Sequence, residues 1–364
     1  MKILFYFSHP AQYFFLRETI KRLIKTNHVI IILIKTKDVL EDVLIGDNFE
    51  YINILPTERG LTKLDIFFSL LKRLRIMFPI LIEKKPDLLI GADASIAILG
   101  KFLHINRITI TEDDYAIIRI LAKITYPFTQ TILCPVVCSV GKYEQKKIGY
   151  HGYMKLGYLH PNIFTPEFTV KQKYQLGDNY ILIRLSGLKA HHDFGIKGIS
   201  ESVLKRLIFN AEKFNYKVFI SSEKKIKHEL QQYELKINPR DMHSVLANAS
   251  ILICDSQSMS VEAAILGVPS IRISDFVGRI SVLEELEHKY GLTYGVKPGN
   301  EDFLFERFNY LLNNKYLKDN FQYRKNNMLR DKIDVTAFLV WFVENYPESV
   351  KIMKETPEYQ YRFR

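Results

Sequence analysis

Residues 250–271 read SILICDSQSMSVEAAILGVPSI, and this stretch decides how the chain folds. The apolar run Ile251–Cys254 is typical of a buried strand. Three serines then follow within five residues. A helix is predicted to begin among these serines and to end at Gly267 and Pro269, where the next strand starts. A strand, a polar turn, a helix and a second strand in this order are the repeating unit of a parallel α/β sheet.

The polar turn of this stretch has the residue types of a nucleotide site. Backbone N–H groups at the start of a helix attract anions, so a phosphate is the expected ligand. Glu262, predicted near the first turn, can accept hydrogen bonds from a ribose diol. The alternative is that Ser256 or Ser258 only caps the helix and that Glu262 is a solvated carboxylate stabilised by the helix dipole. The spacing alone leaves both interpretations open.

The composition is that of a globular protein with room for two domains. The chain has 364 residues, 47% of them hydrophobic, and a domain typically takes about 150 residues. No apolar run approaches the roughly 18 residues of a membrane span, and the run at 3–7 is too short for a signal peptide. Three cysteines give neither a disulfide framework nor a zinc-ligand spacing. We therefore expect a cytoplasmic protein without a bound metal.

The formal net charge of +11 predicts an anionic partner, which could be a membrane, a nucleic acid or a phosphorylated substrate. No zinc finger, RNA-binding aromatic signature or helix-turn-helix is recognisable, so nucleic acid is not expected. Residues 64–85 combine aromatic and aliphatic side chains with five lysines and arginines, as helices on anionic membranes do. The alternative is a core helix whose basic side faces water.

Apolar segments alternate with helical patterns along the first half of the chain. Strands are predicted at 2–7, 29–35, 51–55, 87–90, 107–111 and 131–136. Helices are predicted at 11–25, 38–44, 62–84, 96–103 and 115–125. Because the strands are almost continuously apolar, they indicate a parallel sheet covered by helices on both faces.

The same alternation restarts after a segment rich in Tyr, Gly and Pro at 150–166. Strands are predicted at 180–185, 217–221, 251–254 and 270–273. Helices are predicted at 202–214, 242–249, 281–290, 300–312 and 335–345, in addition to the one after Asp255. Two open sheets in tandem would bind ligands at the carboxyl ends of their strands, in a shared cleft.

Acidic and imidazole side chains gather where the predicted strands end. In the first half these are His9, Asp93, Glu112, Asp113 and Asp114, and in the second half Ser186, Lys189, His191, His192 and Asp193. Histidine can transfer protons near neutral pH, and so can a carboxylate whose pKa is raised. The alternatives are helix caps at His9 and at Asp113 or Asp114, and a polar loop at His191 and His192. No tight ligand spacing indicates a metal.

The block Asp-Ser-x-Ser-x-x-x-Glu-Ala-Ala-x-x-Gly-x-Pro at 255–269 resembles the GT-B superfamily of nucleotide-sugar glycosyltransferases and non-hydrolysing UDP-N-acetylglucosamine 2-epimerases. The segments 3–11, 157–161 and 191–193 are similar to an uncharacterised GT-B-like family whose members often accompany surface-polysaccharide genes. The resemblance implies two tandem Rossmann-like domains with parallel sheets facing a central cleft. It implies an N-terminal domain at 1–160, a nucleotide-sugar domain at 161–334, and a C-terminal helix in 335–364 that crosses back to the first domain.

The epimerase comparison assigns individual residues. Asp255, Ser256 and Glu262 match a loop that holds phosphates and ribose, and Asp93 and Glu112 match catalytic carboxylates. A catalytic histidine of that family falls near His191 or His192. Two features depart from the epimerase pattern. The stretch at 9–11 lacks a matching Arg or Lys, and the paired glycines of the nucleotide loop are Gln257 and Ser258 here.

The resemblance thus implies a glycosyltransferase that uses a nucleotide sugar, most simply a UDP-sugar, to build a surface polysaccharide or glycolipid. A 2-epimerase and a non-catalytic nucleotide-sugar binder are the alternatives. The catalytic candidates are His9, Asp93, Glu112, Asp113, His191 and His192. The binding candidates are Ser186, Lys189, Asp255, Ser256, Ser258, Met259, Glu262 and Arg272. No cofactor is required, the acceptor is a sugar or a lipid-linked sugar, and a homodimer stays open.

Overall fold

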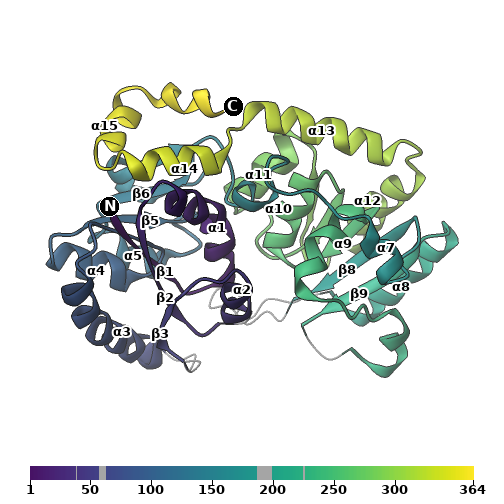
Figure 1. Cartoon of the computed structure of the whole chain (residues 1–364). Coiled ribbons are helices and arrows are strands. Elements are labelled where there is room, and N and C mark those ends of the chain that lie inside the picture. Colours follow the sequence, from purple (N-terminus) through teal and green to yellow (C-terminus); the bar gives the residue numbers. More distant parts are fainter. Residues whose placement is uncertain (38, 57–62, 187–198, 224–225) are drawn as a thin grey trace. The chain divides into compact units, whose positions relative to one another are not determined.

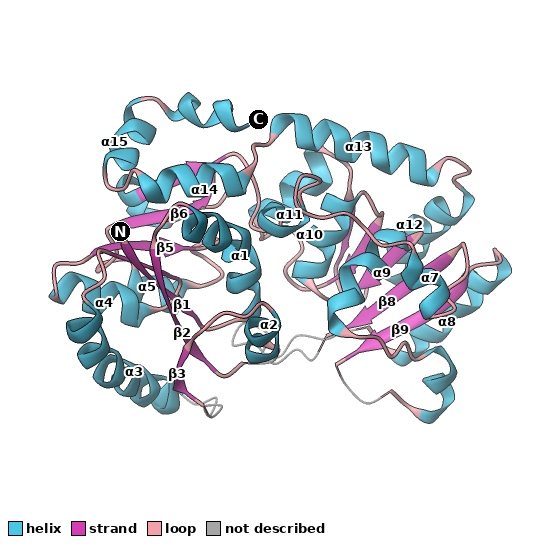
Figure 2. Ribbon diagram, viewed as in Figure 1, coloured by secondary structure: helices cyan, strands magenta, loops and turns pink. Residues whose placement is uncertain are grey.

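The computed structural model describes residues 1–37, 39–56, 63–186, 199–223 and 226–364. The chain forms two compact units (Figure 1). Unit 1 consists of Met1–Tyr158 and Lys332–Arg364, and unit 2 consists of Leu159–Asp331. Each unit contains one parallel sheet with helices packed on it (Figure 2), so the predicted α/β class is confirmed.

The sheet of unit 1 has seven parallel strands in the order β3-β2-β1-β4-β5-β6-β7. The strands are β1 (Lys2–Phe7), β2 (Val29–Lys35), β3 (Ile52–Leu55), β4 (Leu88–Gly91), β5 (Asn106–Ile110), β6 (Thr131–Pro135) and β7 (Lys147–Tyr150). β1 is an interior strand between β2 and β4, and five of its six residues are fully buried. Because a strand in this position is covered on both faces, its sequence Lys-Ile-Leu-Phe-Tyr-Phe shows no polar alternation.

The strand order places the helices of unit 1 on two faces of the sheet. The connecting helices are α1 (Pro10–Lys25), α2 (Leu40–Gly46), α3 (Lys63–Lys84), α4 (Ala94–Phe102) and α5 (Arg119–Thr125). The chain moves outward from β1 to β3, then returns to β4 beside β1 and moves outward in the opposite direction. Since such crossovers are right-handed, α1 covers one face, whereas α3, α4 and α5 cover the other. The direction reverses between β1 and β4, which is where open α/β sheets bind ligands.

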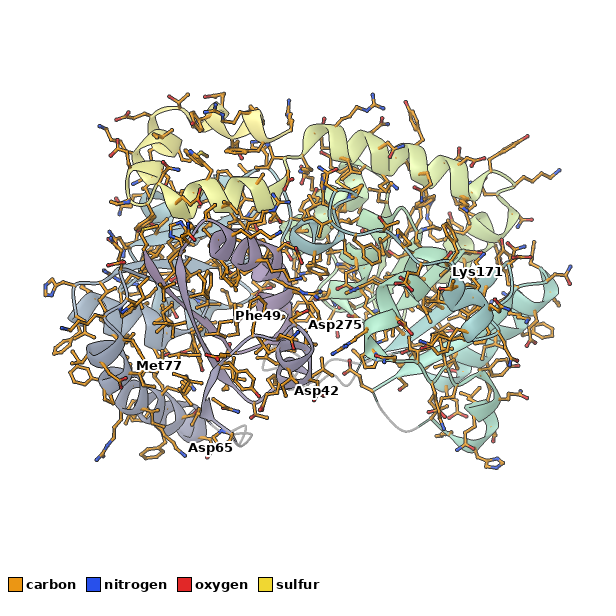
Figure 3. All side chains as sticks on the ribbon, viewed as in Figure 1. Asp42, Phe49, Asp65, Met77, Lys171 and Asp275 are labelled. Carbon is orange, nitrogen blue, oxygen red and sulfur yellow. The ribbon has the colours of Figure 1, made fainter. Side chains whose placement is uncertain are left out.

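One apolar cluster of unit 1 lies between the sheet and α3. It contains Leu4 and Tyr6 from β1, Leu89 from β4, and Met77 and Leu81 from α3 (Figure 3 labels Met77). Met77 and Leu81 are four residues apart and therefore point from one side of the helix. This packing fixes α3 against the sheet and decides which side of the helix faces outward.

The C-terminal segment, α14 (Val335–Glu344), α15 (Glu348–Glu355) and a 3-10 turn at Pro357–Phe363, belongs to unit 1. α14 packs against α1. The ring of Phe338 is fully buried, with its centroid 6.2 Å from Tyr150, 5.7 Å from Phe342 and 5.9 Å from Phe363. This aromatic cluster ties the end of the chain to the N-terminal sheet. Shorter elements of this unit are a 3-10 turn at Gly141–Lys146 and α6 (Leu156–Leu159), which runs to the unit boundary.

The sheet of unit 2 has five parallel strands in the order β12-β11-β10-β8-β9. The strands are β8 (Tyr180–Leu185), β9 (Lys217–Ser222), β10 (Ile251–Cys254), β11 (Ser270–Ile273) and β12 (Thr293–Val296). The helices are α7 (Thr169–Lys173), α8 (Glu201–Lys213), α9 (Met242–Asn248), α10 (Gln257–Leu266), α11 (Ser281–Glu284), α12 (Glu301–Asn313) and α13 (Leu317–Asp331). Short helical turns lie at His228–Tyr233, Pro239–Asp241 and Glu285–Lys289. The direction of the sheet reverses between β8 and β10, so α10 begins at its switch point.

Several elements were not predicted, among them β7, β12, α6, α7, α13 and α15. β7 (Lys-Ile-Gly-Tyr) and β12 (Thr-Tyr-Gly-Val) are short edge strands interrupted by glycine, which weakens the strand signal. α13 is mostly polar and buries only three side chains, so its apolar period is faint. The helix predicted at 115–125 begins later, at Arg119. Within the described residues, no helix is both long and apolar enough to span a membrane.

Phe338 provides a test of how the C-terminal segment is held. We expect Phe338→Ala to lower the unfolding free energy of unit 1 by about 3–5 kcal/mol, because it empties a buried aromatic site. Phe168→Ala is the matched control, since its ring is exposed and its loss should change stability by less than about 0.5 kcal/mol. Urea unfolding followed by fluorescence measures both. Equal effects would show that the C-terminal segment contributes little to unit 1.

Candidate active site

The first group of polar residues follows the carboxyl ends of strands in unit 1. His9 follows β1 and is the N-cap of α1, because its Nδ1 accepts the backbone N–H of Ala11 at 3.2 Å. The capping role weighed from the sequence is therefore real. The ring is nevertheless exposed. When the imidazole is neutral, an accepting Nδ1 places its proton on Nε2.

Asp93 follows β4 and is held firmly in place. Its Oδ1 accepts hydrogen bonds from the backbone N–H of Ser95 at 2.9 Å and from its hydroxyl at 2.6 Å, so Asp93 caps α4. The same oxygen accepts from Nε of Arg73 at 3.2 Å, and the Arg73 side chain is only 5% exposed. This arrangement uses Asp93 to fix the start of α4 and to neutralise a buried guanidinium.

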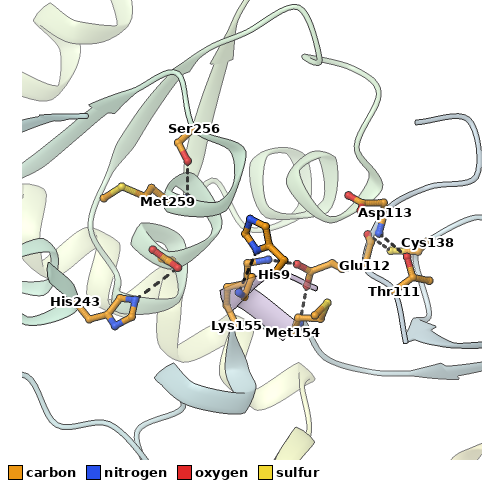
Figure 4. Close-up of polar contacts among 12 residues, drawn as sticks. His9, Thr111, Glu112, Asp113, Cys138, Met154, Lys155, His243, Ser256 and Met259 are labelled. Carbon is orange, nitrogen blue, oxygen red and sulfur yellow. Dashed lines mark hydrogen bonds and ion pairs between the residues drawn. The ribbon is translucent and has the colours of Figure 1, made fainter. Parts of the chain in front are cut away.

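Glu112 follows β5 and forms a nearly buried ion pair with Lys155 (Figure 4). Its Oε2 contacts Nζ of Lys155, and its Oε1 accepts the backbone N–H of Met154 at 2.5 Å. The two side chains are 11% and 9% exposed. The pair therefore joins the end of β5 to the segment that precedes α6, the last element before the unit boundary.

Asp113 and Asp114 differ in exposure although they are adjacent. Asp114 is buried, and its Oδ1 accepts the backbone N–H of Ser139 at 2.8 Å. Asp113 is exposed, and its backbone N–H donates to Oγ1 of Thr111. Neither residue caps α5, whose N-cap is Ile118. The predicted capping role of Asp113 or Asp114 is wrong, because α5 begins later than the sequence pattern indicates.

The second group lies at the switch point of the sheet in unit 2. Asp255 ends β10 and is buried, and its Oδ1 accepts the backbone N–H of Ser186 at 2.7 Å. This bond joins the carboxyl ends of the paired strands β8 and β10. Asp255 thus positions the turn through one carboxylate oxygen, and its predicted contact with a ligand stays a prediction.

The turn after Asp255 leads directly into α10, whose first backbone N–H groups have no acceptor within the helix. Ser256 is the N-cap of α10, and its Oγ accepts the backbone N–H of Met259 at 3.4 Å (Figure 4). The backbone N–H groups of Gln257 and Ser258 come earlier and have no acceptor within the helix. The Ser258 side chain is exposed, whereas Met259 is buried. The first turn of α10 contains no acidic residue, so the positive end of its dipole is not neutralised there.

Glu262 lies in the second turn of α10 and not in the first turn, as the sequence pattern suggested. The alternative of a first-turn carboxylate stabilised by the dipole is therefore wrong, since that effect fades beyond the first turn. Oε1 of Glu262 lies 3.6 Å from Nε2 of His243 on α9, and the two side chains are 12% and 21% exposed. Both therefore reach the surface at one polar spot beside α10.

Arg272 on β11 is fully buried, and its predicted contact with a ligand stays a prediction. Its Nη1 donates to Oε1 of Gln257 at 3.1 Å, and Gln257 in turn donates to Oγ of Ser274 at 2.6 Å. Burial lowers the pKa of Arg272, although Glu287 favours the charged form. Arg272 is a positioning residue, because it hydrogen-bonds from β11 to Gln257, the first residue of α10.

Three predicted residues, Lys189, His191 and His192, lie outside the described residues. Among the residues that the structure describes, no group of three or more His, Cys, Asp or Glu side chains is placed to hold a metal ion. The three cysteines are buried and unpaired by disulfides.

Sequence reasoning missed three partners of the candidate residues. Lys155 and His243 are ordinary polar residues in the sequence, and only the fold brings them to Glu112 and Glu262. Arg73 was assigned to a basic outer surface, but it is buried against Asp93. Arg73 lies between Lys72 and Arg75 in the sequence, so no local pattern marks it as the buried cation of the three.

Comparison with known proteins supports the fold. No protein-family model matches the chain, and no curated protein matches it. Among solved structures, the UDP-GlcNAc 2-epimerase of Neisseria meningitidis bound to UDP-GlcNAc is similar, with a TM-score of 0.61 and 15% identity over 90% of this chain and 99% of that chain. The UDP-GlcNAc 2-epimerase of Methanocaldococcus jannaschii gives a TM-score of 0.63 and 17% identity over 86% and 94%.

A spinosyn forosaminyltransferase is also similar, with a TM-score of 0.60 and 14% identity over 90% of this chain and 95% of that chain. Epimerases and glycosyltransferases are thus both found among the neighbours. The likeness confirms the predicted fold of two Rossmann-like domains.

The Glu112–Lys155 pair is testable by a double-mutant cycle. Lys155→Met should destabilise unit 1 by about 3 kcal/mol or more, because it leaves a nearly buried carboxylate without its cation. Adding Glu112→Gln should recover part of this loss, which gives a coupling of about 1 kcal/mol or more by urea unfolding. The exposed pair Lys205–Glu229 is the control and should couple by less than about 1 kcal/mol. Additive effects at Glu112 and Lys155 would contradict the assigned pairing.

Proposed function

We propose that this chain is a glycosyltransferase-type enzyme whose unit 2 binds a nucleotide sugar, with a UDP-sugar as the donor. The observation that carries the proposal is the start of α10. Two backbone N–H groups without helical acceptors, an exposed serine and a first turn free of acidic residues lie at the switch point of the sheet. This combination favours a diphosphate, which carries negative charge and accepts several hydrogen bonds.

The pair of Glu262 and His243 is the proposed ribose contact. A carboxylate accepts hydrogen bonds from vicinal hydroxyls, and Glu262 is one further turn along α10 from the proposed phosphate position. His243 contacts the same carboxylate, so it orients Glu262 and can itself hydrogen-bond a sugar or base. The similar epimerase structure from Neisseria meningitidis has UDP-GlcNAc bound, which agrees with a UDP-sugar as ligand.

Unit 1 supplies the proposed acid–base groups. Asp93, Glu112 and Asp114 are tied to buried partners, whereas Asp113 and His9 are exposed at the ends of β5 and β1. We assign Asp113 as the base that takes the proton of the acceptor hydroxyl. The acceptor oxygen then bonds to the anomeric carbon of the donor sugar. At the same time the bond between that carbon and the diphosphate oxygen breaks. His9, through Nε2–H, is a donor to an oxygen of a substrate.

The charge of the leaving diphosphate would be balanced by the N–H groups at the start of α10. The arrangement therefore accounts for transfer with groups of the protein. The acceptor remains as expected from the sequence, a sugar or a lipid-linked sugar in polysaccharide or glycolipid synthesis. Cytoplasmic location belongs to the same proposal.

A nucleotide-sugar 2-epimerase is the second candidate, since several solved structures with the same fold carry that name. Epimerisation at carbon 2 requires removal and return of a proton on the sugar. Two of the carboxylates that the epimerase comparison assigned to this task, Asp93 and Glu112, hold buried cations here. This favours transfer over epimerisation. A non-catalytic binder on the same scaffold is the third candidate.

The phosphate assignment predicts opposite effects of one substitution on stability and on affinity. Ser258→Asp places a carboxylate in the first turn of α10, where it should leave stability unchanged or raise it by about 0.3–1 kcal/mol. It should weaken UDP binding at least about tenfold, because it repels the diphosphate. Ser202→Asp is the matched control, since Ser202 is exposed and occupies the same position of α8 after the N-cap Ser200. Calorimetric titration with UDP measures the affinity. Unchanged affinity in Ser258→Asp would remove α10 from the site.

The reaction class is tested with a panel of nucleotide sugars, without acceptor, by proton NMR. We expect a UDP-sugar to show line broadening without conversion, because transfer requires a second substrate. Asp113→Asn should broaden the donor signals as the wild type does, since Asp113 acts on the acceptor. A new sugar epimer would instead establish the epimerase. Binding of no nucleotide sugar would contradict the proposal as a whole.

A further inference from the structure

α3 carries apolar side chains on both its inner and its outer side. The inner side carries Arg73, Met77 and Leu81, which are buried. The outer side carries an exposed stripe at intervals of three and four residues, which places its members in one row along the helix. The stripe consists of Phe68, Leu71, Arg75, Phe78 and Ile82, and Phe67 extends it. A helix that only covers a sheet would carry polar residues in this row.

The outer sides of α4 and α5 continue the apolar surface. The three helices are neighbours on one face of the sheet, with α3 beside α4 and α4 beside α5. The ring centroids of Phe78 on α3 and Phe102 on α4 are 6.4 Å apart, so the surface is continuous there. Phe102 is 70% exposed and Ile120 on α5 is 71% exposed. The apolar members are Phe67, Phe68, Leu71, Phe78, Ile82, Phe102, Ile120, Leu121 and Ile124.

The charges on this surface are of one sign. Exposed cations alternate with the apolar side chains along α3, α4 and α5, and they are Lys72, Arg75, Lys101, Arg119 and Lys123. The sequence contains no Asp or Glu from 66 to 82, on α4, or on α5. Glu83, at the end of α3, is paired with Lys84 at 2.8 Å. Together with the nine apolar members named above, these five residues form what we term the basic apolar surface.

We infer that the basic apolar surface binds the face of a lipid bilayer that contains anionic lipids. Apolar and aromatic side chains can enter the boundary between headgroups and acyl chains, while adjacent lysines and arginines contact lipid phosphates. Contact is peripheral, since no helix within the described ranges is suited to span a membrane. The inference goes beyond the proposed function, because it concerns unit 1 and requires no nucleotide.

The basic apolar surface differs from the segment expected from the sequence. The sequence pattern placed the contact on 64–85 alone and counted Arg73 among its cations. In the structure Arg73 is buried and does not belong to the surface. Exposed residues of α4 and α5 do belong to it. A surface of three helices buries more apolar area against lipid than one helix does, which strengthens binding.

Sedimentation with vesicles tests the inference. The protein should sediment with vesicles of phosphatidylcholine and phosphatidylglycerol, but not with phosphatidylcholine alone, and added salt should weaken the binding. Phe102→Ser/Ile120→Ser and Arg119→Glu/Lys123→Glu should each reduce the partition coefficient by about tenfold or more. All four side chains are exposed, so both variants should retain the thermal midpoint of the wild type.

Two matched variants on unit 2 separate the surface from the overall charge. Phe168→Ser/Tyr316→Ser removes side chains of equal exposure, 70% and 69%. Lys315→Glu/Lys318→Glu changes the net charge as much as the variant on α5 does, at exposed sites. Both controls should bind vesicles as the wild type does.

Three results would overturn the inference. The first is that the wild type shows no preference for anionic vesicles. The second is that both surface variants bind vesicles as the wild type does. The third is that the controls lose as much vesicle binding as the surface variants do. Sedimentation velocity adds a fourth. A dimer in solution that Phe102→Ser dissociates would assign the surface to a second copy of the chain. UDP binding is measured separately in Ser258→Asp, so failure here leaves the proposed function standing.

Discussion

Parallel pairing of the strands is the constraint on which the rest of the structure depends. Each parallel sheet brings the carboxyl ends of all its strands to one edge, and the order of the strands fixes where their direction reverses. In unit 1 the reversal brings β1 beside β4, and in unit 2 it brings β8 beside β10. His9 and Asp93 follow the first two strands, and Ser186 and Asp255 follow the other two. Every candidate group of the site owes its position to this pairing.

Most polar groups at these edges stabilise the edge itself. Asp93, Glu112, Asp255 and Arg272 are hydrogen-bonded within their own units, and each fixes the start of a helix or the end of a strand. Such groups cost free energy when buried and are retained only where their hydrogen bonds are made. Among the described candidates, His9, Asp113 and Ser258 are exposed at the surface. The distinction between supporting and exposed groups is the basis for assigning roles within the site.

The sequence predicted the fold class and the main strands, because long apolar runs and the Gly-x-Pro helix end at 267–269 are local signals. Gly267 indeed ends α10 in the left-handed conformation, with φ of 73°. The sequence pattern did not predict β7 and β12, because each of these four-residue strands includes a glycine. It also did not predict the polar helix α13. The sequence also could not predict which candidate side chains are exposed or which are paired. Lys155, for example, is 43 residues from its partner Glu112. Distant contacts of this kind follow from the fold and not from a local pattern.

The central claim is that the start of α10 holds the diphosphate of a nucleotide. A crystal structure of the protein with UDP tests it most directly. The account predicts phosphate oxygens within hydrogen-bond distance of the backbone N–H groups of Gln257 and Ser258, with the ribose hydroxyls on Glu262. Phosphates bound elsewhere in unit 2, or Glu262 still closed on His243 with no contact to the ribose, would contradict it.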